Sequence, residues 1–158
     1  MKKMIGAILL TLSVSALAQE QGHLSVQTTV QKETVVMNEN GEQETTLVPA
    51  ETVVPGERVI YTITFENVSD QPAGDVVITN PISDNLIYVD GSAFGPGTDI
   101  EFSVDGGQSF AAANELTVDE DGASRAATVD DFTHIRWVMQ NELAVGAQGT
   151  ARFTAQLK

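Results

Sequence analysis

Residues 58–66 read RVIYTITFE, and this stretch decides the fold class because its hydrophobic period is two. Four alternate positions in it are apolar: Val59, Tyr61, Ile63 and Phe65. The positions between them are polar, with Ile60 as the exception. Side chains of a β-strand point alternately to opposite faces, so the stretch predicts a strand with one buried face. Three further segments alternate in the same way: 76–78, 135–139 and 151–157.

Turn signals separate these segments at short intervals. Asn40-Gly41 lies between 34–37 and 45–48 and predicts a hairpin, because both residues tolerate positive φ. Further signals are Pro55-Gly56, Asn80-Pro81, Asp90-Gly91, Gly95-Pro96-Gly97 and Asp105-Gly106-Gly107. Many short strands with regular turns predict an antiparallel sandwich or barrel. Residues 111–116 and 130–132 predict single helical turns, and the acidic stretch 119–131 predicts a surface loop.

The first eighteen residues are typical of a secretory signal peptide. Lys2 and Lys3 precede an apolar run over 4–17, and Ala16-Leu17-Ala18 places small residues where a signal peptidase cuts, leaving Gln19 first. The alternative is a transmembrane anchor, but the run is shorter than the ~20 residues that a spanning helix needs. We therefore expect cleavage after residue 18 and a periplasmic or secreted product.

Charge and composition narrow the classes of partner. The chain has 8 Lys and Arg against 22 Asp and Glu, a net charge of −14. The predicted signal holds two of the basic residues and none of the acidic ones, so the cleaved chain would carry six basic against 22 acidic residues, a net −16. Such a surface repels nucleic acid and anionic lipid. Without cysteine there is neither a disulfide framework nor a lipid-modified cysteine, and we expect no integral membrane anchor.

The family resemblance rests on three blocks of sequence. Residues 54–67, VPGERVIYTITFEN, and then 73–92 resemble the opening of a bacterial conserved-repeat family called domain of unknown function eleven. The Trp strand at 135–137, followed by a glycine-containing turn and the segment ending at Phe153, is similar to its late signature. The resemblance covers roughly residues 47–157; it departs over 94–132 and does not include the N-terminal hairpin.

This resemblance implies an immunoglobulin-like antiparallel β-sandwich with Greek-key connections. Members are found in surface and envelope proteins, often as tandem repeats that act as spacers or adhesive modules. The chain resembles a single copy, and one unit makes no stalk. We expect a signal peptide over 1–18, an N-terminal strand and hairpin over 19–46, and the sandwich over 47–158, the last two as one domain.

The sequence offers little for catalysis. Nucleophilic catalysis needs a nucleophile beside a base, but the chain has no cysteine, no Gly-x-Ser-x-Gly motif and only two histidines, His23 and His134. His23 is expected to be solvated, and His134 to face outward if Trp137 faces the core. Asn67-Val68-Ser69 matches the glycosylation sequon, which the bacterial type of signal discounts. We expect no enzymatic activity.

Metal binding is the sharper alternative. Calcium prefers oxygen ligands at loop spacing, and the weak candidates are Asp119, Asp121, Asp130 and Asp131. They do not follow the EF-hand spacing, and acidic runs in so acidic a chain are usually solvated. We expect no cofactor, with calcium as the alternative.

The sequence allows two interpretations of Trp137. A single Trp on an alternating strand is usually a core residue between two sheets, and Ile135 and Met139 share its face. A ligand-stacking Trp is the alternative. Tyr61 is likewise expected in the core, with its hydroxyl reaching a partner at the rim.

The leading hypothesis is therefore an exported, non-enzymatic structural or protein-interaction module of the cell envelope, which could offer an edge strand to a protein partner. The rival is a soluble periplasmic protein that binds a ligand or calcium through its acidic loops.

Overall fold

The computed structural model describes residues 24–158, so the predicted signal peptide, residues 19–22 and His23 lie outside the described residues. The described chain is all-β, with one short 3-10 turn. Its elements are β1 (Leu24–Met37), β2 (Gln43–Pro49), β3 (Arg58–Asn67), β4 (Val77–Pro81), β5 (Leu86–Tyr88), β6 (Thr98–Ser103), η1 (Ala113–Glu115), β7 (Thr117–Glu120), β8 (Ala123–Ala126), β9 (His134–Met139) and β10 (Gln148–Leu157).

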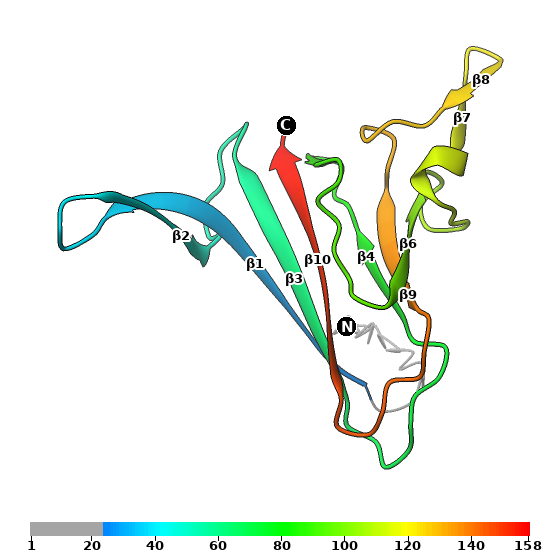
Figure 1. The fold of residues 1–158 in the computed structure, drawn as a ribbon. Helices are drawn as coiled ribbons and strands as arrows, with labels where there is room; N and C mark the ends of the chain where they lie inside the picture. Colours follow the sequence, from blue (N-terminus) through cyan, green and yellow to red (C-terminus); the bar gives the residue numbers. More distant parts are fainter. Residues whose placement is uncertain (1–23) are drawn as a thin grey trace, which may run out of the picture.

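Two antiparallel sheets pack together, as the alternating patterns predict. The larger has the strand order β2-β1-β3-β10-β5, and the smaller has the order β4-β9-β6. Figure 1 shows the two sheets facing one another and joined at one end by the connections β3–β4 and β9–β10. The stretch that decided the fold class, β3, lies at the centre of the larger sheet, between β1 and β10.

The core lies between the sheets and is built from the alternating positions. Val59, Ile63 and Phe65 of β3 are buried, and so are most of the other predicted inward residues, whereas Tyr61, Met139 and Leu157 are partly buried. The other buried ones are Val76, Ile78, Ile135, Trp137, Ala151, Phe153 and Ala155. The indole of Trp137 and the ring of Phe153, from opposite sheets, have centroids 6.1 Å apart. The core reading of Trp137 is therefore confirmed, since its side chain is fully buried.

The N-terminal segment belongs to the larger sheet. β1 pairs with β3 from Leu24 to Lys32 and with β2 from Gln31 to Met37. The boundary expected between residues 46 and 47 falls inside β2. Beyond Lys32 the β1–β2 hairpin extends away from the sandwich, as Figure 1 shows in blue and cyan. We call residues 33–47 the arm.

The Asn40-Gly41 hairpin is confirmed, but its turn differs from the expected one. Only Gly41 has a positive φ, of 79°. The Asn38 amide donates to the Glu42 carbonyl, and the Gly41 amide donates to the Asn38 carbonyl. The loop thus has three residues, with glycine in the left-handed position that a three-residue hairpin requires.

The loop predicted over 119–131 was wrong in its first half. Residues 117–126 form a second hairpin, β7–β8, with Asp119 opposite Ser124. Its two-residue turn is Asp121-Gly122, with φ values of 53° and 81°. Both central residues of such a turn need positive φ, which Asp-Gly supplies. The flanking residues are mostly polar and exposed on both faces, so no apolar alternation marked the strands.

The remaining local predictions fall on short segments. The helical turn expected within 111–116 is confirmed as η1, a single 3-10 turn. Residues 129–131 form a hydrogen-bonded turn, in which the Asp131 amide donates to the Thr128 carbonyl. Among residues 24–158, no helix has the length and apolar character required to span a bilayer.

Candidate functional site

The four predicted calcium candidates do not form one site. Asp119 lies on β7, Asp121 at the tip of the β7–β8 hairpin, and Asp130 and Asp131 in the turn before β9. Within residues 24–158, no three His, Cys, Asp or Glu side chains are grouped so that they could hold a metal ion. The β7–β8 hairpin thus holds Asp119 and Asp121, whereas Asp130 and Asp131 belong to a separate turn.

Asp131 has a structural role. Arg125 of β8 donates to both of its carboxylate oxygens, at 2.7 and 2.9 Å, and also pairs with Glu120 at 2.6 Å. The Thr128 amide and hydroxyl donate to the same carboxylate. These donors stabilise the charged form, with Arg125 the largest influence, so the pKa of Asp131 lies well below its usual range. Arg125 and Asp131 therefore tie the β7–β8 hairpin to the turn before β9.

His134 lies on the outer face of the smaller sheet, opposite in direction to Trp137. Its ring meets the edge of Phe110, with centroids 6.4 Å apart, and its Nδ1 lies 3.2 Å from the Thr133 hydroxyl. Arg136 covers the Phe110 face at 4.2 Å and is paired with Glu101. The prediction that His134 faces away from the core is confirmed.

Tyr61 and Trp137 both pack against Phe153. Tyr61 is half-buried and stacks on Phe153 with centroids 4.8 Å apart, and burial raises the pKa of its hydroxyl. The rim partner predicted for this hydroxyl is not found among the described residues. Trp137 Nε1 also has no hydrogen-bond partner within residues 24–158, although it is buried.

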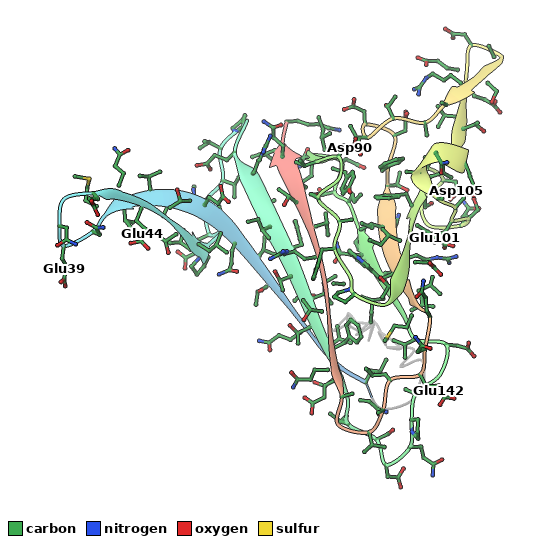
Figure 2. The ribbon with its side chains drawn as sticks, in the orientation of Figure 1. Glu39, Glu44, Asp90, Glu101, Asp105 and Glu142 are labelled. Carbon is green, nitrogen blue, oxygen red and sulfur yellow. The ribbon has the colours of Figure 1, made fainter. Side chains whose placement is uncertain are left out.

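A carboxylate that the sequence reading treated only as part of a turn, Asp105, organises the loop after β6. It accepts hydrogen bonds from the Ser103 and Ser109 hydroxyls and from the Gln108 and Ser109 amides. These donors, the Ser103 hydroxyl first among them, hold the pKa of Asp105 well below its usual range. The Asp-Gly-Gly-Gln-Ser spacing was a usable signal, because Asp side chains commonly accept bonds from the amides that follow. Figure 2 shows Asp105 and Glu101 on the side of the smaller sheet, away from the arm.

The free edge of the larger sheet is the strongest candidate interaction surface. β2 pairs only with β1, so its other edge has no neighbour among the described strands. The hydrogen bonds Asn38 N to Glu42 O and Ala50 N to Val30 O fix the alternation of the ladder. Counting from them, the backbone groups of Glu44, Thr46 and Val48 turn toward β1, and those of Gln43, Thr45 and Leu47 turn outward.

The arm is also exposed on its faces. Val35, Met37 and Leu47 are 61, 66 and 44% exposed, and the smaller sheet does not cover them. Figure 2 places Glu39 at the far tip of the arm and Glu44 along β2. The arm therefore offers a partner an unpaired backbone edge together with apolar side chains.

No protein-family model, no curated protein and no solved structure matches this chain. The resemblance to the conserved-repeat family stays a prediction.

Proposed function

We propose that this protein is an exported, non-enzymatic interaction module of the bacterial cell envelope, and that it binds a protein partner by β-strand addition to β2. The observation that carries the proposal is the arm, which extends a paired backbone ladder beyond the sandwich and leaves its outer edge open. The immunoglobulin-like family resemblance, with its envelope setting, supports the same class of function.

Strand addition suits this edge physically. A partner strand would pair with the outward amides and carbonyls of Gln43, Thr45 and Leu47. Natural edge strands are usually guarded by lysine, proline, a bulge or very short length. β2 is seven residues long and contains no lysine, and its proline, Pro49, is the last residue. Exposed apolar side chains on the arm add area that a partner would remove from water.

The test compares two substitutions of Thr45 in capture from envelope extract. Thr45→Pro removes an outward amide without removing a bond to β1, whereas Thr45→Ala keeps the amide. We expect wild type and Thr45→Ala to capture the same protein, and Thr45→Pro to lose it. Binding measured with the purified partner should show the same loss. Equal capture by Thr45→Pro, with thermal melts unchanged, would exclude strand addition at this edge.

Export is tested separately. Mass spectrometry of the protein recovered outside the cytoplasm should find Gln19 as the first residue, in accordance with the Ala16-Leu17-Ala18 signal. Recovery of exported protein that retains Met1 would refute cleavage.

A further inference from the structure

Two arginines differ from the other basic residues of residues 24–158. Lys32 pairs with Glu57, Arg125 with Glu120 and Asp131, and Arg136 with Glu101, while Lys158 donates to the Asp84 carbonyl. Arg58 and Arg152 form no ion pair and donate no side-chain hydrogen bond to any described residue. The chain has 22 acidic residues, so this lack of partners in two exposed arginines is informative.

Both arginines line one groove on the outer face of the larger sheet. A cavity of about 420 Å³ is lined in part by Arg152, Leu47 and Ser92. An adjoining cavity of about 200 Å³ is lined by Arg58. The two share four lining residues, which make them one continuous groove: Glu33, Ile60, Ser92 and Thr154. The arm forms one wall through Leu47, and the centre of the sheet forms the floor.

The register of β3 and β10 sets the spacing of the two charges. Arg152 is opposite Thr62, which is four residues along β3 from Arg58. At ~3.3 Å per residue, the two arginines are offset by ~13 Å along the strands. Ile60 and Thr154 are opposite one another, midway along that offset. The groove thus presents a cation, a mixed apolar and hydroxyl centre, and a second cation.

Two neighbours modify these charges. The guanidinium of Arg152 lies over the ring of Phe94, 5.3 Å from its centroid, which restricts its position without neutralising it. Glu33 lines the groove at both cavities and is the acidic side chain in their lining. An anionic ligand would therefore be attracted to the two arginines and repelled by Glu33.

We propose that this groove binds an extended acidic peptide with the pattern acid-x-apolar-x-acid. Such a peptide places side chains i and i+4 on one face ~13 Å apart, which matches the offset of Arg58 and Arg152. Its residue i+2 then meets Ile60 and Thr154 at the centre. Each arginine can hold a carboxylate through two parallel hydrogen bonds. The site lies on the outer face of the sheet, where side chains of β2, including Thr45, form part of its wall, whereas strand addition would use the outward backbone groups of β2.

The probe is the peptide acetyl-GETVTEG-amide, titrated into the full mature chain and followed by NMR chemical shifts. Two peptides serve as controls: acetyl-GEETVTG-amide, with the same composition but adjacent acids, and acetyl-GQTVTQG-amide, without acids. We expect the first peptide to bind most tightly, to shift the Ile60 and Thr154 amides, and to weaken as salt rises.

Substitutions test whether binding depends on the groove or on the overall charge of the protein. Arg58→Gln and Arg152→Gln should each weaken binding roughly fivefold, the order of an exposed ion pair at low salt. Glu33→Gln should tighten peptide binding severalfold. Lys158→Gln is the control: it removes one positive charge, as each arginine substitution does, but lies outside the groove and should leave the affinity unchanged. The melting temperature of every variant is measured in parallel.

Three outcomes would overturn the proposal. The first is equal affinity for the spaced and adjacent acids, and the second is unchanged binding in the double arginine variant. The third is the absence of any chemical shift change with the peptide at about 5 mM, a concentration above the ~1 mM Kd of a weak specific complex. Failure here is distinguishable from failure of strand addition, because Thr45→Pro and Thr45→Ala both lack the Thr45 side chain that lines the groove, and only Thr45→Pro lacks the outward amide.

Discussion

Gly95 lies directly against the indole of Trp137. A Cβ atom at residue 95 would stand 2.4 Å from Trp137 Cδ1 and 3.0 Å from Nε1. The connection that precedes β6 therefore approaches the largest core side chain so closely that only glycine fits. The backbone at this point closes the core beside the indole, where a side chain would displace it.

Gly95→Ala is expected to lower the free energy of unfolding by about 1–3 kcal/mol, because a fully buried indole cannot move aside without disturbing its neighbours. Gly74→Ala is the matched control, since its Cβ would meet nothing closer than 3.8 Å. Urea denaturation of both variants measures the difference. Equal stability of the two would show that the Trp137 environment is loosely packed.

Asn67 is expected to be a major contributor to stability. It is 1% exposed, and its Nδ2 donates to the Gln71 and Leu143 carbonyls at 2.7 and 2.9 Å. Its Oδ1 accepts from the amide and hydroxyl of Ser69. Asn67→Ala removes four hydrogen bonds made by a buried side chain and should cost about 2–4 kcal/mol. Asn80→Ala, which removes one exposed hydrogen bond to the Pro81 carbonyl, should cost much less. Thermal melts of both variants measure the difference.

Asp105 predicts a pH dependence of stability. The hydrogen bonds that it accepts lower its pKa in the folded state, so the folded state binds its proton less readily than the unfolded state does. The stabilisation is complete above the unfolded pKa of ~3.9 and is lost as pH falls below it. Asp105→Asn should therefore be less stable than wild type at pH 7, with the gap narrowing below about pH 5.

Urea melts between pH 7 and pH 3 measure this gap. Asp70→Asn is the control, because Asp70 is exposed and its side chain has no hydrogen bond with a described residue. A gap that stays constant with pH would mean that the Asp105 loop does not stabilise through the carboxylate charge.

The arm should open independently of the sandwich. Its side chains are mostly exposed on both faces, whereas β3 is paired on both sides and covered by the smaller sheet. Local opening is favoured where few apolar contacts are lost. In native-state hydrogen exchange, amides of the arm that bond across β1–β2 should exchange at least about 100-fold faster than central amides of β3. Equal protection would mean that a further surface covers the arm.

Prediction from the sequence succeeded where a single periodicity governed a whole strand. The alternation around Ile63, Trp137 and Phe153 placed these side chains in the core, because one face of each strand is buried and the other is not. It failed for β7–β8, where neither face is buried and the only signal was Asp121-Gly122. The calcium candidates fall on the same stretch, where no hydrophobic pattern indicated that Asp119 and Asp121 lie in a hairpin and Asp130 and Asp131 in a separate turn.

The sequence by itself determined the all-β class, the core-facing positions and the Asn40-Gly41 hairpin, because these depend on local turn chemistry and on a period of two. Only the tertiary structure decided that Gly95 meets Trp137, that Asp131 is bound by Arg125, and that Arg58 and Arg152 share one groove. These relations join residues on different strands or connections, and their distances follow from sheet order and register. A periodicity within one strand carries no information about which strand becomes its neighbour.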